Sequence, residues 1–358
     1  MILKTTYTKA WVEKIRKQKD YKKADPSNIE KMLYALSLLE NLVESRLEFI
    51  FKGGTALILL FEKPYRFSID IDIITSKTKE LLEEKLDNII ENSLFTHWEL
   101  DEKRSYKSGV PKAHYKFFYK NANFSLGNSI LLDVLFSKNP YIETVKTPIK
   151  TDFLDTEEPY SFVTTPSLNS ILGDKLTAFA PNTTGIKYNS GKQIEIIKQL
   201  FDVSLLIDCC NNISIAKSTF IKIANEEVNF RKLSINYKDV IEDIFNTALI
   251  FAKRDKNKAE PEKSQFKELQ TGTKNISNYL IIRNLKIEQA IASSAKTSYF
   301  TQLFLKDENV IFAPYSKQIN LTELEIKNTD YNFINRFKKT NKEAFYYWFI
   351  CLELKNCI

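Results

Sequence analysis

Several residue types that mark common classes of protein are scarce in this chain of 358 residues. Only 8 glycines and 10 prolines are present, which argues against collagen-like, proline-rich and flexible-linker architectures and favours long helices. Four cysteines are too few for a disulfide framework in a chain of this length. The only histidines are His97 and His114, so a histidine-rich zinc site and an HExxH metalloprotease are excluded.

Long hydrophobic runs are also missing. No apolar segment approaches the roughly 18 residues that a membrane-spanning helix needs, and the N-terminus lacks the apolar core and cleavage site of a signal peptide. We therefore expect a soluble, cytoplasmic protein without a membrane partner. Hydrophobic residues make up 43% and charged residues 27%, which is globular composition, and the length favours two domains.

The net charge of +7 is distributed unevenly. Residues 206–358 hold 23 basic and 18 acidic residues, which leaves only a small excess in residues 1–205. A mild basic bias suits a polyanionic partner, although it is weaker than in a dedicated nucleic-acid-binding domain.

Periodicity predicts an α+β protein with strands and helices up to about residue 206 and a helix-rich C-terminal domain; the mixed sheet flanked by helices is what the family resemblance described below implies. The expected helices cover residues 26–46, 77–91, 168–179 and 192–210, and the expected strands cover residues 47–52, 66–75, 95–101, 113–119 and 129–136. Residues beyond 211 have a helical pattern. The change of pattern near residue 206 predicts an N-terminal helical segment (1–46), a core (47–206) and a helical C-terminal domain (207–358).

Two carboxylates lie two positions apart in the predicted strand 66–75. Asp70 and Asp72 would share one face, opposite Ile69, Ile71 and Ile73. Carboxylates in this arrangement can share or bridge divalent ions. Taken alone, the pair favours a solvated edge strand that carries two surface acids.

A glycine pair precedes these acids, between a predicted strand and a helix start. At Gly53 and Gly54 the backbone could approach a phosphate closely, and the helix N-terminus offers N–H groups, with Thr55 as a further donor. A Walker A loop is absent. Asp133 is the one charge in the apolar strand 130–136; it either completes the acid set or caps a strand end, because an isolated buried charge is costly unless it is paired or metal-bound.

The motifs KGGTAL (52–57) and RFSIDID (66–72) resemble the opening motif of the AbiEii/AbiGii nucleotidyltransferase toxin family, part of the DNA polymerase β-like nucleotidyltransferase superfamily. The segments GDKLTAFAP (173–181), Gly185-Ile186 and EIIKQLFD (195–202) are similar to later motifs of that family. The resemblance covers about residues 48–206. It implies a nucleotidyltransferase-type sheet in the core.

The resemblance also implies roles for individual residues. Asp70, Asp72 and Asp133 would bind Mg²⁺ or Mn²⁺, and the first two motifs would hold the triphosphate through Gly53, Gly54, Thr55, Arg66 and Ser68. Lys175 would neutralise triphosphate charge and belong to the catalytic set with the three acids. Lys198 and Asp202 share a helix face and would lie at the edge of the nucleotide site or form a surface salt bridge.

The function that follows is transfer of NMP from NTP to an RNA acceptor, tRNA-like, with release of pyrophosphate, by the toxin of a toxin–antitoxin or phage-defence system. A cognate antitoxin would be the protein partner. Two alternatives stay open: a small-molecule nucleotidyltransferase of the antibiotic-modifying type, and a catalytically degenerate interaction module.

Three further features have simple structural interpretations. The aromatic run 345–349 is predicted to pack in a helix core rather than to stack on bases. The basic segment 253–258 could contact phosphates but favours a solvated loop. Cys209 and Cys210 are predicted to be buried helix residues.

Overall fold

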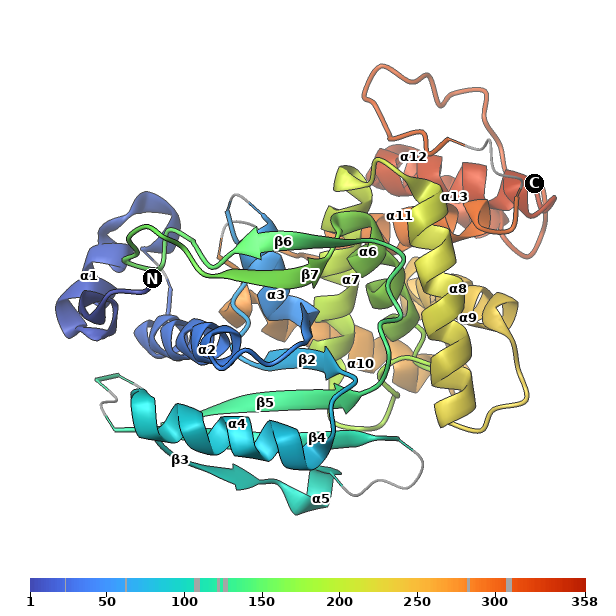
Figure 1. Cartoon of the computed structure of the whole chain (residues 1–358). Coiled ribbons are helices and arrows are strands. Elements are labelled where there is room, and N and C mark those ends of the chain that lie inside the picture. Colours follow the sequence, from blue (N-terminus) through green and yellow to red (C-terminus); the bar gives the residue numbers. More distant parts are fainter. Residues whose placement is uncertain are drawn as a thin grey trace. The chain divides into compact units, whose positions relative to one another are not determined.

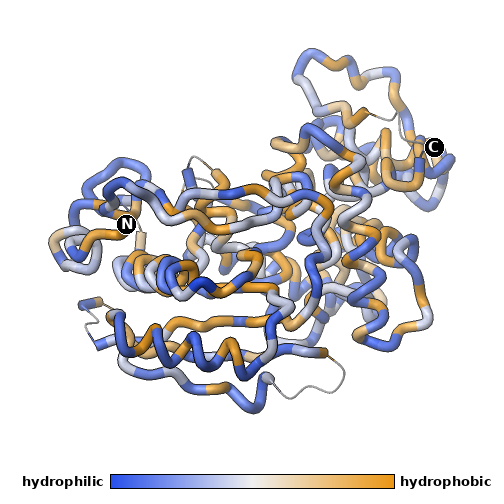
Figure 2. The backbone as a smooth tube through the Cα atoms, in the orientation of Figure 1, coloured by the Kyte–Doolittle hydropathy of each residue, from blue (hydrophilic) through white to orange (hydrophobic). Residues whose placement is uncertain are grey.

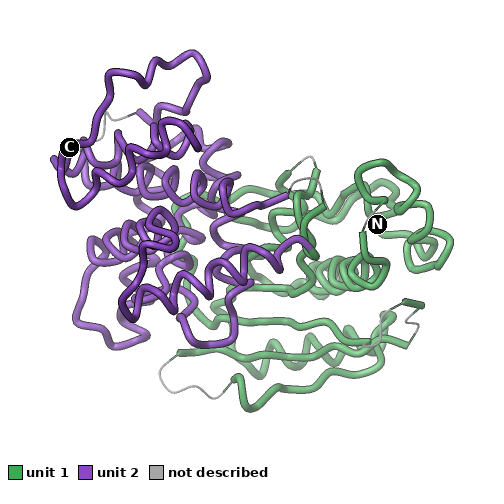
Figure 3. The backbone as a smooth tube through the Cα atoms, turned by 180° about the vertical axis from the view of Figure 1, so that it is seen from behind, with its two compact units in different colours: residues 1–167, 278–283 green, residues 168–277, 284–358 purple. Residues whose placement is uncertain are grey.

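The computed structural model describes residues 1–358 except 23, 62, 106–109, 121–122, 125–127, 282–283 and 307–310. The chain forms two compact units (Figure 3), one made of residues 1–167 and 278–283 and the other of residues 168–277 and 284–358. The boundaries expected at 46 and 206 do not coincide with this division, so the three-domain scheme stays a prediction. No helix in the described ranges is long and apolar enough to cross a membrane.

The first unit combines a mixed sheet with helices (Figure 1). Its elements are η1 (Lys4–Tyr7), α1 (Lys9–Lys17), η2 (Lys19–Tyr21), α2 (Pro26–Glu44), β1 (Ile50–Lys52), α3 (Gly53–Leu60), β2 (Ile71–Thr75), α4 (Lys79–Asn92), β3 (Phe95–Leu100), α5 (Glu102–Ser105), β4 (Lys112–Tyr119), β5 (Ser129–Phe136), β6 (Thr144–Pro148) and β7 (Phe162–Pro166). Five strands form a sheet in the order β1-β2-β5-β4-β3, and β6 pairs with β7. The β2–β5 pair is parallel and the other pairs of the sheet are antiparallel.

One face of the five-stranded sheet is covered by α2 and α4. On β4, buried and half-buried residues alternate along the strand, as a sheet with one packed face requires. Tyr34 of α2 stacks on Tyr119 with ring centroids 3.7 Å apart, and the hydroxyl of Tyr115 donates to Glu83 of α4. In Figure 2 the residues of β5 are mostly hydrophobic, whereas hydrophobic and hydrophilic residues alternate along α4. The opposite face is half-exposed and carries the candidate site.

The second unit is helical. Its elements are α6 (Leu168–Ala178), α7 (Gln193–Cys209), α8 (Ile213–Phe230), α9 (Tyr237–Lys253), η3 (Arg254–Lys256), α10 (Glu262–Asn275), η4 (Ile276–Tyr279, which runs into the first unit), α11 (Ile287–Leu303), η5 (Asn332–Arg336), α12 (Phe337–Thr340) and α13 (Lys342–Leu354). Trp348 is fully buried, with its ring edge-on to Phe245 at 5.6 Å. The prediction that the run 345–349 packs in a helix core is confirmed for Phe345 to Trp348, which are all buried.

The α+β class and the mixed sheet flanked by helices are confirmed, and most predicted elements are present with shifted ends. The strand predicted over residues 66–75 is shorter in the structure, because β2 begins only at Ile71. Residues 65–67 pair instead with residues 279–281: Phe67 N–H donates to the Tyr279 carbonyl and Ile281 N–H to the Tyr65 carbonyl. The prediction that Cys209 and Cys210 are buried in a helix is wrong, because α7 ends at this point: Cys209 is its exposed last residue and Cys210 is the half-exposed residue after it.

Candidate active site

The glycine turn joins β1 directly to α3. Gly53 is the first residue of the helix and has φ +80°, a conformation that favours glycine. A Cβ at this position would overlap Oδ2 of Asp72 and lie 2.8 Å from its Cγ. The Asp72 carboxylate therefore lies directly against the glycine turn; that the two form one phosphate and metal site stays a prediction.

Gly54 is in contact with Arg66 and Ser68 of the RFSIDID motif. A Cβ added there would overlap Nη2 of Arg66 and come within 2.7 Å of the Ser68 hydroxyl. Arg66 is buried, and its Nη1 donates to the carbonyl of Phe67 at 3.0 Å. Gly54 is thus required by the close approach of this protein's own guanidinium.

Thr55 connects the turn to the first acid. Its side chain is fully buried, and its hydroxyl donates to the backbone carbonyl of Asp70 at 2.6 Å. The Ser68 hydroxyl oxygen lies 3.0 Å from the Thr55 hydroxyl oxygen. The Thr55 hydroxyl therefore fixes the segment that carries Asp70, which is a positioning role that the sequence did not suggest.

Polar residues line up across the half-exposed face of the sheet. Lys52 is paired in register with Asp72, Asp72 with Asp133, and Asp133 with His114, on four neighbouring strands. Register partners on adjacent strands point to the same face, and the strands lie about 4.8 Å apart. Asp72 and Asp133 are therefore neighbours in one row on the sheet. Their metal binding and catalytic roles stay predictions.

Asp133 is held by two cationic or polar partners. His114 Nδ1 lies 2.6 Å from its Oδ1, and Arg104 Nη2 of α5 lies 3.1 Å from its Oδ2. Asp133 is thus a paired charge within β5 and not a cap at a strand end; that it completes the acid set stays a prediction. His114 alternates with buried Ala113 and Tyr115 on β4, which places it on the site face, but its pairing with Asp133 depends on strand register that one sequence does not encode.

The chemistry of the donor set suits a hard divalent cation, because carboxylate oxygens are what Mg²⁺ prefers. In the described ranges, however, no three histidine, cysteine, aspartate or glutamate side chains are gathered into one ligand group. Asp72 and Asp133 fit as neighbouring donors. Asp133 would have to exchange at least one of its two present partners for the ion.

The remaining predicted site residues belong to the second unit. Lys175 of α6 and Asp202 of α7 form an ion pair with Nζ 2.8 Å from Oδ2, and their side chains are 7% and 2% exposed. Lys175 also donates to Gln199 at 3.2 Å. Lys198 contacts Glu195 at 2.8 Å. The alternative of a surface salt bridge does not fit Asp202, which is buried and pairs with Lys175 across two helices.

The segment around Gly185 is fixed by buried polar contacts. The Arg231 guanidinium donates to the carbonyls of Thr183, Thr184 and Gly185. Asp243 accepts hydrogen bonds from the Asn182 backbone at 2.8 Å and from the Thr183 hydroxyl at 2.8 Å. Burial raises the pKa of Asp243 in spite of these hydrogen bonds, which act in the opposite direction. The segment around Gly185, which belongs to the later family motifs, is therefore part of the packing of the helical unit.

Three solved structures are similar to this chain at low sequence identity. A candidate nucleotidyltransferase from Helicobacter pylori is 18% identical over 70% of this chain and 93% of its own, with a TM-score of 0.35. JHP933 from Helicobacter pylori is 18% identical over 70% and 90%, with a TM-score of 0.34. An antigenic nucleotidyltransferase-like protein from Paracoccidioides brasiliensis is 14% identical over 60% and 97%, with a TM-score of 0.36. These scores are too low to carry an activity over.

No curated protein matches this chain. The family described as "Nucleotidyl transferase AbiEii toxin, Type IV TA system" matches residues 37–273. The match spans the glycine turn, Asp70 just before β2, Asp72 within β2, Asp133 and the Lys175–Asp202 pair. The chain therefore belongs to the AbiEii nucleotidyl transferase toxin family of type IV toxin–antitoxin systems.

Proposed function

We propose that this nucleotidyltransferase transfers NMP from NTP to an RNA acceptor, tRNA-like, and releases pyrophosphate. The observation that carries the proposal is the contact between the Gly53 turn and the Asp72 carboxylate. It brings the N-terminus of α3, where backbone N–H groups favour anions, next to an acid whose register partner is Asp133. A phosphate held by the turn would lie beside carboxylates that favour a divalent cation.

Asp70, Asp72 and Asp133 are the proposed holders of Mg²⁺ or Mn²⁺. The bound ion would supply charge neutralisation at the phosphates and a lower pKa of the attacking hydroxyl. Thr55 fixes the backbone at Asp70, so the acids are oriented before substrate arrives. Such preorganisation of charge is the main contribution a protein makes to phosphoryl and nucleotidyl transfer.

Gly53 and Gly54 are proposed to bind the triphosphate through their backbone N–H groups, which lie in the first turn of α3. Arg66 and Ser68, which border Gly54, would supply further donors, with Thr55 positioning the segment. Lys175, Lys198 and Asp202 are proposed as further parts of the nucleotide site, on the strength of the family motif alone. The Lys175 ammonium already has Asp202 as its counter-ion.

The proposed partners are an acceptor RNA and a cognate antitoxin. The net charge of +7 favours a polyanionic acceptor. A small-molecule acceptor, and a degenerate interaction module, are the competing functions. The module is disfavoured because both acids, the glycine turn and Lys175 are all present.

The test is incubation of the full-length protein with each α-labelled NTP, Mg²⁺ and total RNA, followed by separation of RNA, protein and small molecules. We expect label in RNA, and none with Asp72→Asn. Glu91→Gln, an exposed acid at the end of α4, is the matched control and should keep full activity. Label in a small molecule would support the first alternative, and no label with any NTP would support the second.

A further inference from the structure

A small pocket lies in the helical unit, apart from every residue assigned above. Its volume is about 290 Å³, at the lower end of the range for small-ligand sites. It is lined by Arg254, Asp255, Lys256, Glu288, Arg336, Phe337 and Thr340. These residues come from η3, the start of α11, η5 and α12. A cavity of this size suits one phosphate with its sugar and not a peptide helix.

The positive charges of the lining exceed its negative charges. Three cations face two acids, and one acid, Glu288, is taken by the Arg254 guanidinium. Nε of Arg254 is buried and has no hydrogen-bond partner in the described part of the chain. A buried donor without an acceptor is costly. The lining as a whole keeps one net positive charge, which an anion in the pocket would neutralise.

Aromatic rings back the cations. The Arg254 and Arg336 guanidinium groups lie 6.0 and 5.1 Å from the Phe337 ring centroid. Lys256 Nζ lies 5.5 Å from the Phe333 ring centroid. Cations on ring faces are held in place by the ring quadrupole, while the edge of a guanidinium stays available to hydrogen-bond acceptors.

Arg336 has a different role from the other two cations. Its Nη2 donates to the carbonyl of Ala252 at 2.6 Å and to that of Lys253 at 3.3 Å, so it closes the C-terminal end of α9. Burial, and the charge of Arg254 close by, lower the pKa of Arg336. Two like charges are therefore held near each other by the scaffold. Arg254 itself has φ +51°, a backbone conformation that non-glycine residues adopt at an energetic cost and that is concentrated at functional sites.

We propose that this pocket binds a phosphate group of the acceptor RNA, with Arg254 and Lys256 as the contacting cations and Arg336 as the positioning residue. The inference rests on the proposed function for the identity of the acceptor. Guanidinium groups match phosphate oxygens in geometry as well as charge. The same phosphate chemistry could come from a free nucleotide, and the experiment separates the two sources.

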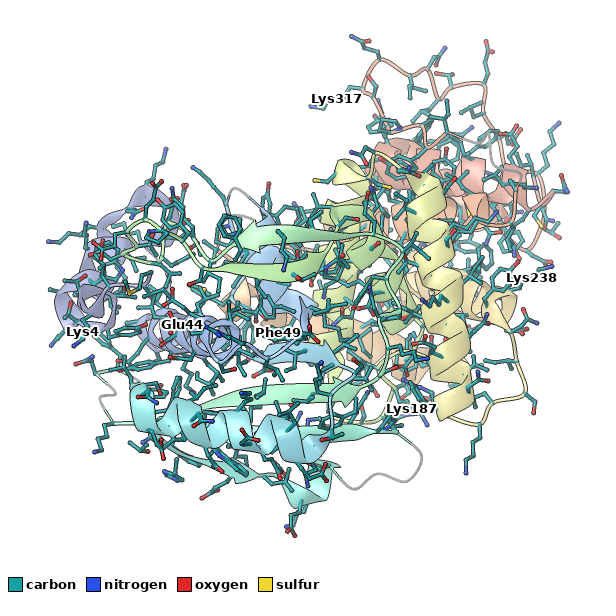
Figure 4. The ribbon with its side chains drawn as sticks, viewed as in Figure 1. Lys4, Glu44, Phe49, Lys187, Lys238 and Lys317 are labelled. Carbon is teal, nitrogen blue, oxygen red and sulfur yellow. The ribbon has the colours of Figure 1, made fainter. Side chains whose placement is uncertain are left out.

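The test measures the binding of a fluorescent, 5′-phosphorylated single-stranded RNA to the full-length protein by anisotropy at several salt concentrations, without NTP or metal. Each phosphate contact contributes about −0.7 to the slope of log K against log salt for single strands. Because the pocket is proposed to hold one phosphate, we expect Arg254→Gln with Lys256→Gln to make the slope shallower by about 0.7 and to weaken binding at low salt. Lys238→Gln with Lys317→Gln is the matched control, since both lysines are exposed (Figure 4), and it should change the slope much less.

A second variant guards against misfolding. Lys256→Glu alters an exposed residue and should weaken RNA binding even if the double variant unfolds, which thermal unfolding would reveal. Unchanged RNA affinity in both pocket variants would overturn the proposal, and so would an equal loss in the control. Weaker binding of free ATP in calorimetry, with RNA binding intact, would assign the pocket to a free nucleotide and overturn the RNA assignment. The RNA measurement involves no transfer, so it can succeed even if the NTP assay shows no activity.

Discussion

The Lys175 ammonium lies 2.8 Å from the Asp202 carboxylate, and both side chains are almost completely buried. Removing one partner of a buried ion pair leaves an uncompensated charge and costs about 3–5 kcal/mol, whereas replacing both with apolar residues is often neutral. We therefore expect Lys175→Met to lower the free energy of unfolding strongly, and Lys175→Met with Asp202→Leu to recover most of the loss. Urea unfolding measures this.

The same variants test the nucleotide assignment without confusing it with folding. The stable double variant should bind NTP more weakly than the wild type, as measured by calorimetry with a non-hydrolysable analogue. Wild-type affinity in the double variant would remove Lys175 from the nucleotide site. Lys238→Met, at an exposed position in the first turn of α9, is the control and should change neither the free energy of unfolding nor the affinity for NTP.

A second prediction concerns Gly53. Gly53→Ala must adopt a positive φ, which costs about 1–2 kcal/mol, and its methyl group must displace the Asp72 carboxylate. We expect modest destabilisation and loss of nucleotidyl transfer. Gly191 has φ +71° with open space around the added Cβ, so Gly191→Ala should show the strain alone and keep activity. If Gly53→Ala stays active, contact with Asp72 is not needed for transfer.

A third prediction concerns the metal dependence of transfer. Because Arg104 forms an ion pair with Asp133 and His114 is within hydrogen-bond distance of it, Arg104→Gln should leave the carboxylate more available and lower the Mg²⁺ concentration needed for half-maximal transfer. Asp133→Asn should raise it. Lys116→Gln, on the same sheet face but paired with Asp101, serves as the control. A titration of activity against Mg²⁺ that is identical in all variants would exclude Asp133 from metal binding.

The sequence predicted the glycine turn, both acids and most of the secondary structure, because hydrophobic periodicity and glycine placement are local signals. It could not predict that Asp72 and Asp133 share a register or that His114 joins them, since register is a relation between distant segments. The short strands β6 and β7 were missed. Residues 144–148 are mostly exposed and lack the alternating apolar pattern on which prediction of a strand depends.

The pairing of residues 65–67 with 279–281 could not be predicted for the same reason. More than 200 residues separate the two segments, and neither has a distinctive pattern. The alternation of Ile69, Ile71 and Ile73 with the two acids favoured a longer strand. The backbone groups of this segment are instead satisfied by a loop from the other end of the chain.

A fourth prediction concerns alkaline pH. Burial raises the pKa of the Cys351 thiol from about 9 to about 12. The folded state therefore keeps a proton that the unfolded state loses, so stability is fully present below pH 9 and falls as the pH rises towards 12. The free energy of unfolding should fall by about 1.4 kcal/mol per pH unit in this window, and less steeply in Cys351→Ala.

Thiol labelling provides an independent measurement on the same residue. Cys209 is exposed and should react with a maleimide in the native protein, whereas Cys351 should react only after unfolding. Cys209→Ser is the control that removes the fast phase. Fast labelling of Cys351 at neutral pH would contradict its burial, and parallel pH profiles of wild type and Cys351→Ala would contradict the raised pKa.

The short segment 278–283 has a consequence for how this toxin can be divided. It belongs to the first unit, although both of its flanks belong to the second, so the chain crosses between the units three times. A single cut directly after residue 167 separates Phe67 from the Tyr279 carbonyl that accepts its N–H. Neither unit can then be expressed or exchanged between homologues as one contiguous stretch of gene, and a gene cut there would encode the first unit without residues 278–283.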